Sequence, residues 1–519
     1  MQEQFAEDSR FRNMPVRLEG VIGVPAGERP HPVVLIMHGS HVLCPTEDIW
    51  PCSPEEEQKN YVGFTYLVEE LAKAGYVALS INLNAEHTYA YGESPVAMRT
   101  RQLIDLHLGE LVAANVGESD RFGVDLEGRV DLAQIVWLGH SRGGDIANQI
   151  VREQGLEQSA SPLGYGPVNA LLLVAPAVFT LDALPVVDLP FAVVIPTCDG
   201  DVANLSGTRF YESARLDGDR SQLALSVYLE GANHNSFNSI LDAERIGDME
   251  DRPDCAEGNS LTAVAQQTFL SQFAIDFLET IFGQPDQAAA ALERLGMDTT
   301  MPLPTSYDNV AVRVSFLPTS TNQLTILEPQ SGAELSQNLL GGAVYLNGVT
   351  AQFCPEGYYV PANEPGSEPC KRVNFNQPGY PQEFVFGWDS PDAEWRMEIP
   401  ESEADLSGAT AFQFRVGLDP LSELNKESEP QSLTVELVDS SGKSARVISP
   451  PIEFPIGQRQ SLEQFEGDFF SGHVYLNSVR IPLAEFEDVD LMHITEIALV
   501  LDQTPSGTLF IADLAFVME

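Results

Sequence analysis

A serine at position 141 stands in a setting that suits nucleophilic catalysis. Residues 139–143 read Gly-His-Ser-Arg-Gly, which matches the pattern G-x-S-x-G. The apolar run 135–138 precedes this motif and a helix is expected after Gly144, so the pattern predicts a sharp strand–turn–helix with Ser141 at its apex. Glycines at both ends of the motif fit because side chains there would clash across so tight a turn. The alternative is a glycine-rich turn without chemistry.

A serine hydroxyl is a weak nucleophile unless a base takes its proton, and histidine is the usual base. With a serine on a turn of this kind, the acid and then the histidine follow along the chain. The histidines after Ser141 are His234, His473 and His493. The last two fall in the β-rich second half, so elimination leaves His234, just past the apolar run 223–229. A solvent-exposed loop histidine without chemistry is the alternative.

The acid that would orient His234 is expected at the end of the preceding strand. The apolar run 191–195 leads into residues 196–202, which contain two carboxylates, Asp199 and Asp201. In sheets of this kind the acid usually stands three residues before a valine that turns the chain, which favours Asp199; Asp201 is the alternative. The carboxylate would hold one tautomer of the imidazole and stabilise the imidazolium.

An acyl-transfer reaction also needs two N–H donors for the oxyanion. The backbone amide of Arg142, directly after the serine, is one expected donor. The second is expected in the loop after the first buried strand, where residues 38–41 read His-Gly-Ser-His. This sequence resembles the histidine–glycine oxyanion loop of esterases and lipases, with Ser40 as the donor and His41 as the alternative. His38 precedes the serine and is expected to be a structural hydrogen-bonder.

The elements that must position these groups alternate between strands and helices in the first half of the chain. This alternation predicts an α/β fold, namely a doubly wound, mostly parallel sheet covered by helices. Expected strands lie at 33–37, 76–81, 135–138, 170–174, 191–195 and 223–229, and expected helices at 65–74, 97–115, 145–154 and 261–282.

At 519 residues the chain exceeds what one hydrophobic core normally organises, so two domains are expected. From about residue 305 onward, alternating strands and turn residues replace the helical pattern, as in the runs 311–316, 432–437 and 508–514. This pattern predicts an all-β sandwich, jelly-roll-like in form. The expected division is an N-terminal arm at 1–14, an α/β domain at 15–290, a linker at 291–308 and the sandwich at 309–519.

The composition is strongly acidic. Aspartate and glutamate outnumber lysine and arginine 76 to 28, and the formal net charge is −48. Such a surface repels nucleic acid and anionic lipid, so neither is an expected partner. The same charge keeps a protein dissolved at high ionic strength. No apolar run reaches the length that a membrane span needs.

The six cysteines indicate an oxidising environment. Their spacings match no common zinc site, so no metal site is predicted. Cys44 and Cys52 bracket one short loop and Cys354 and Cys370 another, as local disulfides do, which favours a secreted or periplasmic protein. The chain begins without a basic and apolar leader, so either a signal peptide has been removed and a Met added or the protein is cytoplasmic. The cysteines favour the first.

The quoted motifs resemble one family. The His-Gly pair at 38–39, the motif at 139–144, the acid loop at 198–202 and Asn-His-Asn at 233–235 make residues 15–290 look like the α/β-hydrolase superfamily. They most resemble secreted bacterial serine esterases that group with platelet-activating-factor acetylhydrolase, chlorophyllase and dienelactone-hydrolase-like enzymes. The resemblance implies ester hydrolysis through an acyl-enzyme, on small-molecule or polymeric esters, without a cofactor. It also implies a Cys198–Cys255 disulfide, with two free buried cysteines as the alternative.

The second half resembles galactose-binding-like jelly rolls, less specifically, through the stretches 479–483 and 507–513. That resemblance implies a module that binds carbohydrate or an insoluble surface, with a structural Ca²⁺ as a further expectation. Trp388 and Trp395 are candidates for a sugar-stacking surface or for core residues.

Three functional hypotheses follow. The first is a serine carboxylesterase with Ser141, His234 and Asp199 as its triad. The second is a polyester or lipid-ester hydrolase that uses the sandwich to adhere to a surface, and peptidase or thioesterase chemistry is open to the same triad. The third, of a different class, is a binding protein with a vestigial hydrolase domain.

Overall fold

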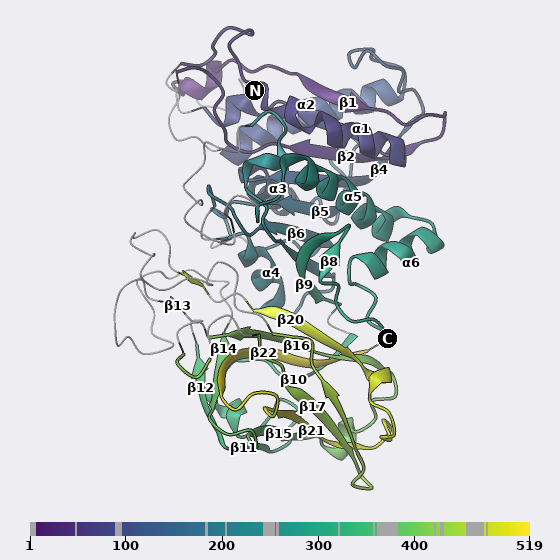
Figure 1. Ribbon diagram of the computed structural model, residues 1–519. Helices are drawn as coiled ribbons and strands as arrows, with labels where there is room; N and C mark the ends of the chain where they lie inside the picture. Colours follow the sequence, from purple (N-terminus) through teal and green to yellow (C-terminus); the bar gives the residue numbers. More distant parts are fainter. Residues whose placement is uncertain are drawn as a thin grey trace.

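The structure is a computed structural model (Figure 1), and it describes most of the chain. The first half is a helix-covered sheet, and the second half consists of two facing antiparallel sheets. The described residues are 7–46, 49–88, 96–181, 185–202, 205–241, 255, 259–319, 322–355, 359–360, 382–419, 422–425, 430–452, 472–473 and 476–518.

The first half is built on a mixed sheet in which nine strands of the described residues pair in the order β1-β3-β2-β4-β5-β6-β7-β9-β8. The pairs from β3 to β7 are parallel, and β1, β8 and β9 join antiparallel. The strands are β1 (Gly20–Gly23), β2 (His31–Met37), β3 (Val77–Ile81), β4 (Val130–His140), β5 (Val168–Val174), β6 (Phe191–Pro196), β7 (Ala224–Leu229), β8 (Ser306–Tyr307) and β9 (Val310–Leu317).

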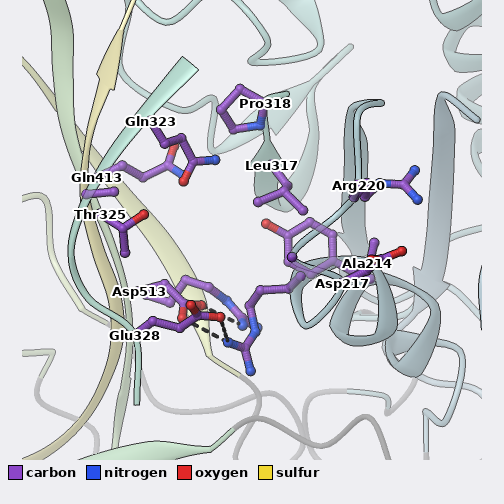
Figure 2. Close-up of a pocket in the computed structure, with 15 residues that line it drawn as sticks. Ala214, Asp217, Arg220, Leu317, Pro318, Gln323, Thr325, Glu328, Gln413 and Asp513 are labelled. Carbon is purple, nitrogen blue, oxygen red and sulfur yellow. Dashed lines mark hydrogen bonds and ion pairs between the residues drawn. The ribbon is translucent and has the colours of Figure 1, made fainter. Parts of the chain in front are cut away.

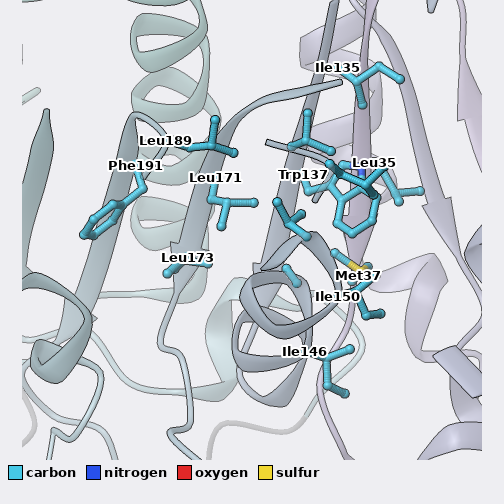
Figure 3. Packing of buried hydrophobic residues seen from close by; sticks show 14 of the residues in the cluster. Leu35, Met37, Ile135, Trp137, Ile146, Ile150, Leu171, Leu173, Leu189 and Phe191 are labelled. Carbon is cyan, nitrogen blue, oxygen red and sulfur yellow. The ribbon is translucent and has the colours of Figure 1, made fainter. Parts of the chain in front are cut away.

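Helices cover both faces of this sheet. They are α1 (Thr65–Ala74), α2 (Val96–Asn115), α3 (Arg142–Gln154), α4 (Thr208–Arg215), α5 (Ala263–Phe282) and α6 (Pro285–Arg294). Successive residues of a strand point to opposite faces, and β4 shows this directly. Ile135 and Trp137 pack with α2, α3 and α4 on one face, whereas Val136 and Leu138 pack with α1 and α5 on the other. Figure 3 shows the first of these layers, with Ile146 of α3 near Met37 of β2.

The second half forms a sandwich of two antiparallel sheets around one apolar core. One sheet has the order β12-β14-β22-β16-β20, with β10 paired to β22, and the other has the order β11-β15-β21-β17-β18. The strands are β10 (Gln323–Leu327), β11 (Val344–Asn347), β12 (Val349–Cys354), β14 (Glu383–Trp388), β15 (Glu394–Glu398), β16 (Ala409–Leu418), β17 (Thr434–Asp439), β18 (Ser444–Ile448), β20 (Asn477–Pro482), β21 (Ile494–Val500) and β22 (Gly507–Met518), besides a short pair of β13 (Tyr359–Val360) with β19 (Gly472–His473).

The predicted fold class is confirmed by this topology, a mostly parallel α/β sheet followed by a β-sandwich. We call the nine-stranded sheet with its helices the α/β unit and the two facing sheets the sandwich. Trp388 and Trp395 are 2% and 1% exposed and belong to the sandwich core, so they form no sugar-stacking surface. Among the described residues, no helix is long and apolar enough to cross a bilayer.

One strand lies in a different sheet from the one that the sequence predicts. The run 311–316 was expected in the sandwich, but it belongs to β9, which pairs with β7 along six residues from Ala224↔Leu317 to Leu229↔Val312. Val312, Val314 and Phe316 face the same apolar core as α5. The expected linker at 291–308 also contains the end of α6 and all of β8. Alternation identifies a strand but not its partner, because half-buried strands look alike in any sheet.

The sandwich packs on the α/β unit through the sheet that contains β16, β20 and β22 (Figure 1). The Gln413 side chain of β16 donates to the Phe316 carbonyl of β9 at 3.0 Å. Arg480 of β20 donates to the carbonyl oxygens of Gly296 at 2.8 Å and Asp298 at 3.0 Å. The interface is therefore hydrogen-bonded through backbone groups as well as side chains.

A buried cluster of ion pairs crosses the same interface. Arg415 Nη1 of β16 lies 3.0 Å from Glu212 Oε2 of α4 and 3.2 Å from Asp513 Oδ2 of β22. Arg215 of α4 contacts the same two carboxylates, at 2.9 Å and 3.0 Å. The cluster borders a cavity of about 210 Å³ between the two parts of the molecule, and Figure 2 shows Glu328 and Asp513 at its edge. Glu328 lies 3.7 Å from Arg215 Nη1.

Candidate active site

Ser141 lies on a strained turn between β4 and α3. Strand β4 ends at His140 and α3 begins at Arg142, and the serine between them has φ 55° and ψ −128°. A positive φ is costly for a residue with a side chain and persists only where the surrounding structure holds it. Here the Ser141 amide donates to the Val174 carbonyl of β5 at 2.9 Å, and the Ser141 carbonyl accepts from Gly144 at 3.0 Å. The strand–turn–helix expected at residues 135–144 is thus present.

The two glycines of the turn are required by close approach rather than by a positive φ. A β-carbon on Gly139 would lie 2.5 Å from the carbonyl carbon and oxygen of Gly143. A β-carbon on Gly143 would lie 2.5 Å from the carbonyl oxygen of Met37, at the end of β2. Both distances are far below van der Waals contact and involve backbone atoms that cannot move aside. Side chains at either position would therefore separate the turn from the sheet.

The structure brings His234 and Asp199 together beside this turn. His234 follows β7 and Asp199 follows β6, so both stand in loops at the carboxyl end of the parallel strands. His234 Nδ1 donates to Asp199 Oδ2 at 2.8 Å, and both side chains are buried. Asp199 Oδ1 accepts from the backbone amides of Asp201 at 2.9 Å and Val202 at 2.6 Å. The Asp199 carboxylate is thereby fixed on three sides.

Asp201, the alternative acid, lies differently. Its side chain is 47% exposed, and its Oδ2 atom is 3.4 Å from His234 Nε2, the ring nitrogen on the far side from Asp199. The two carboxylates therefore meet opposite edges of one imidazole. The hydrogen bond that can fix the tautomer comes from Asp199.

The electrostatics of His234 suit a general base. Burial by itself lowers the pKa of His234, but the Asp199 carboxylate, with a smaller contribution from Asp201, outweighs burial and raises that pKa. The imidazolium is therefore favoured once a proton arrives. His234 Nε2 is buried and has no hydrogen-bond partner among the described residues. Because Nδ1 donates to Asp199, Nε2 of the neutral ring is free to accept a proton.

His140 links this histidine to the turn. Its ring Nε2 donates to the His234 carbonyl at 3.0 Å, and the two ring centroids are 4.9 Å apart. His140 directly precedes Ser141, so the contact holds His234 next to the nucleophile's own strand end. The sequence shows His140 only as the variable residue of G-x-S-x-G, and nothing in that pattern signals this role.

The loop after β2 lies against the serine, as an oxyanion loop would. A β-carbon on Gly39 would be 2.4 Å from Ser141 Cβ and 2.9 Å from its Oγ, so a glycine is required there. His38 holds the loop: its Nδ1 donates to the Gly39 carbonyl at 2.8 Å, and its Nε2 accepts from the Leu83 amide at 2.9 Å. Burial lowers the pKa of His38 to about 4, so the ring is neutral and structural.

Two further groups of the candidate oxyanion hole occupy suitable places. Arg142 is the first residue of α3, where backbone N–H groups lack partners within the helix and carry partial positive charge. Ser40 and His41 directly follow Gly39, which packs against Ser141, so either amide is a candidate for the second donor. The His41 ring also lies in the site, stacked on His140 at 5.3 Å between centroids, a contact that sequence reasoning did not foresee.

Two disulfides are present beside these loops. Cys198, next to Asp199, is bonded to Cys255, and Cys44, three residues after His41, is bonded to Cys52. Cys354 is also disulfide-bonded, and its expected partner Cys370 lies outside the described residues. The acid loop is thus cross-linked to the segment that follows His234.

Asp145 of α3 holds the segment at Phe179 and Thr180 next to the turn. Its Oδ1 atom accepts from the amides of Phe179 and Thr180, each at 3.2 Å, and from the Thr180 hydroxyl at 2.9 Å. The Arg142 guanidinium lies over the Phe179 ring at 5.2 Å. Within the described residues, no cluster of three or more His, Cys, Asp or Glu side chains has the geometry of a metal site.

Comparison with known proteins gives resemblance at the level of solved structures. No protein-family model matches the chain, and no curated protein matches it. The chain is similar to an esterase from Thermogutta terrifontis, with 17% identity and TM-score 0.32 over 52% of this chain and 92% of that one. It is similar to a sugar hydrolase from Lactococcus lactis (13%, TM-score 0.31, 51% and 96%). It is also similar to a family 11 carbohydrate-binding module from Clostridium thermocellum (10%, TM-score 0.22, 38% and 95%).

Proposed function

We propose that this protein is a serine hydrolase that cleaves carboxylic esters through an acyl-enzyme. The observation that carries the proposal is the buried 2.8 Å hydrogen bond from His234 Nδ1 to Asp199, which leaves Nε2 without a hydrogen-bond partner among the described residues, beside the strained turn of Ser141. The nucleophile, the orienting acid and the base follow the ends of the parallel strands β4, β6 and β7, respectively. Strands β6 and β7 are neighbours, and β5 lies between β4 and β6. A vestigial hydrolase would have lost one of these three groups.

In the first half of the proposed reaction, Ser141 Oγ attacks the ester carbonyl carbon and its proton moves to His234 Nε2. The carbonyl π electrons move to oxygen, and the backbone amides of Arg142 and Ser40 donate to the oxyanion. The C–O bond to the alcohol then breaks as the electrons return, and the imidazolium gives its proton to the leaving alkoxide. Asp199 keeps Nδ1–H oriented and remains ionised throughout.

In the second half, water takes the place of the alcohol. His234 Nε2 removes a proton from water as the oxygen attacks the acyl carbon, and the same donors hold the second oxyanion. Collapse releases the carboxylic acid and returns the proton to Ser141 Oγ. Every proton and electron pair is handled by the three side chains and the water, so the proposed reaction requires no cofactor.

We further propose that the protein works in an oxidising compartment, secreted or periplasmic. The two disulfides beside the acid loop and the candidate oxyanion loop support this. The resemblance of the motifs to secreted bacterial esterases agrees with it. A role of the sandwich in binding carbohydrate or an insoluble surface, and a structural Ca²⁺ there, stay predictions.

Replacement of the nucleophile tests the proposal. Ser141→Ala is expected to lower kcat on p-nitrophenyl butyrate by at least about 10³-fold, and a fluorophosphonate probe should label the unsubstituted protein at Ser141. Ser159→Ala, at an exposed serine beyond the end of α3, is the matched control and should retain full activity. Full activity of Ser141→Ala would contradict the proposal, as would labelling elsewhere.

A further inference from the structure

Several histidines surround Ser141, and one of them has neither a role in the proposed reaction nor a hydrogen bond through its Nε2 atom among the described residues. His38, His140 and His234 each place a ring nitrogen in a hydrogen bond. His41 differs, because its Nε2 atom is buried and has no hydrogen-bond partner in the described part of the chain. A buried polar atom without a partner is rare in a folded protein and often marks a place where another group binds.

His41 Nε2 lies close to Gly39. A β-carbon on Gly39 would lie 3.0 Å from His41 Nε2 and 2.9 Å from Ser141 Oγ, so both atoms border the same space above that glycine. The His41 ring is held in place by its stack on His140, with the planes 24° apart. The His41 and His234 ring centroids are 6.2 Å apart and the ring planes are 64° apart, so His41 is a separate group beside the base.

The candidate oxyanion hole is expected on the Gly39 side of the serine. The expected donors, the amides of Arg142 and Ser40, flank Ser141 and Gly39 in the chain, and Gly143 of the turn packs on the Met37 carbonyl at the start of the same loop. The oxygen of a bound ester carbonyl must come to lie between these donors when Ser141 Oγ attacks. His41 Nε2 lies above Gly39, as Ser141 Oγ does, and therefore borders that space.

The charge state of His41 suits a donor and not a second base. Burial, together with the neighbouring rings of His140 and His234, keeps the pKa of His41 well below its usual range, so the ring is neutral near pH 7. A neutral imidazole carries one N–H. In the described residues the carboxylate that would strengthen a base is bonded to His234, and no carboxylate is bonded to His41.

We propose that His41 donates its side-chain Nε2–H to the oxyanion, as a third donor beside the backbone amides of Arg142 and Ser40. This role rests on the proposed function and deepens it. As Ser141 Oγ bonds to the acyl carbon, negative charge develops on the carbonyl oxygen, and this oxygen accepts a hydrogen bond from the His41 N–H. That hydrogen bond lengthens again when the tetrahedral intermediate collapses. The proton stays on His41 throughout. The ring is preorganised, so the interaction is gained mainly in the transition state.

Two substitutions separate donation from packing. His41→Phe keeps an aromatic ring that can stack on His140 but removes the N–H, whereas His41→Gln keeps an N–H donor on a flexible side chain of similar reach. His107→Phe is the matched control, because His107 is also a buried histidine with an unpartnered Nε2 among the described residues, but it lies on α2 and lines a separate cavity with Leu18 and Tyr61. All variants are made in the full chain, and thermal unfolding checks that each is folded.

For His41→Phe we expect kcat on p-nitrophenyl butyrate to fall about 10²- to 10³-fold, with KM changed less than about threefold, because oxyanion donors act in the transition state. The affinity for an alkyl trifluoromethyl ketone, whose adduct with Ser141 carries an oxyanion, should fall by a similar factor. His41→Gln should recover at least about tenfold of the lost kcat, and His107→Phe should match the unsubstituted protein.

The proposal is overturned if His41→Phe keeps full kcat, if kcat falls while affinity for the trifluoromethyl ketone does not, or if His41→Gln is no better than His41→Phe. Failure of the proposed function is distinguishable, because it shows as absent fluorophosphonate labelling of Ser141 in the unsubstituted protein. Intact labelling with a fully active His41→Phe would reject the role of His41 alone.

Discussion

At the scale of single residues, two carboxylates in one short loop meet the same imidazole and have different surroundings. Asp199 is buried, accepts two backbone amides and bonds His234 Nδ1, whereas Asp201 is about half exposed and lies near Nε2. A carboxylate held by fixed donors can orient a ring, and an exposed one contributes mainly its field. Loss of Asp199 should therefore lower the rate, whereas loss of Asp201 should mainly shift the pH profile.

Asp201→Asn is expected to move the pH profile and leave the plateau rate within a few-fold. His234 must be neutral to act as a base, so kcat/KM rises with pH as the ring loses its proton. Asp199, with Asp201 adding to it, raises the pKa of His234 against the effect of burial, and removal of the Asp201 charge lowers that pKa again. The rising limb of kcat/KM should shift to lower pH, measured on a p-nitrophenyl ester in buffers of constant ionic strength.

Asp199→Asn is the companion variant and should lose on the order of 10⁴-fold in kcat, because the wrong tautomer is then favoured. A shift of the limb to higher pH in Asp201→Asn, or a larger loss of plateau rate than in Asp199→Asn, would contradict these roles.

How far the sequence predicts the site depends on whether a residue acts through local pattern or through tertiary contact. Ser141 stands in a turn whose glycines are demanded by backbone approach, so its pattern is local and readable. His234 emerges by elimination, and the position of Asp199 follows from loop spacing. The rings of His41 and His140 meet only because two loops from different strands converge. No spacing along the chain encodes that meeting, so the sequence could offer His41 only as a backbone donor.

At the scale of elements, the Cys198–Cys255 bond connects the acid loop to the segment after His234, across a sequence separation of 57 residues. A longer closed loop restricts the unfolded chain more, so this bond should stabilise the fold more than Cys44–Cys52, which spans 8. The bond also begins one residue before Asp199 and thereby limits the motion of the acid.

The double variant Cys198→Ser with Cys255→Ser is expected to lower the free energy of unfolding by about 2–4 kcal/mol, measured by urea titration. Its kcat should fall as well, because Asp199 is less firmly placed. Cys44→Ser with Cys52→Ser serves as the comparison and should cost less stability. Equal losses in the two double variants would show that loop length does not govern these bonds.

Strand β9 shows what periodicity alone could not decide. Its alternating residues were read correctly as a half-buried strand, but the pattern is the same in either sheet. Pairing with β7 is favoured because Val312, Val314 and Phe316 complete the apolar face that α5 covers. That face exists only after the parallel strands have assembled. Hence the strand was predictable and its place was not.

Truncations on either side of β9 test where the α/β unit ends. A chain that ends after Thr319 retains β9 and should remain folded and active on soluble esters. A chain that ends at Pro304 loses four buried apolar side chains, Tyr307, Val312, Val314 and Phe316, worth about 1.5–3 kcal/mol each, which is comparable with the whole stability of a domain. We expect the shorter chain to show no cooperative thermal transition. Equal transitions for both chains would place β9 outside the α/β unit.

At the scale of the whole molecule, the interface between the two parts is polar and buried. Glu212 is buried and paired with Arg415 and Arg215. Burial by itself raises the pKa of Glu212, but the two arginines outweigh this effect and lower it. Buried ion pairs give little net stability, but removal of one partner leaves an uncompensated charge. The ion pairs therefore favour one relative arrangement of the two parts and add little to the strength of their association. Charged residues alone did not predict this, because such residues mostly face solvent.

Arg415→Met is expected to destabilise the protein by about 3–5 kcal/mol, since Glu212 and Asp513 then lose a buried partner. Arg446→Met is the matched control: in its 2.8 Å pair with Asp502 the two side chains are 48% and 28% exposed, so the pair should be worth at most about 1 kcal/mol. Calorimetry of both variants at one ionic strength measures the difference. A loss no larger than in the control would mean that the interface is solvated.

The pairing of β9 with β7 also determines how a mechanical load would pass through the molecule. The chain leaves β9 at Leu317 and enters the sandwich at β10, so a sandwich tethered to a solid while flow drags the α/β unit would pull on that end of β9. A pull along the strand loads all six residue pairs of the β7–β9 ladder at once, whereas a pull across the sheet would open them one after another. Leu317 pairs with Ala224 at the start of β7, whereas His234 follows the other end of β7, so the load enters the ladder at the end away from the base of the proposed reaction.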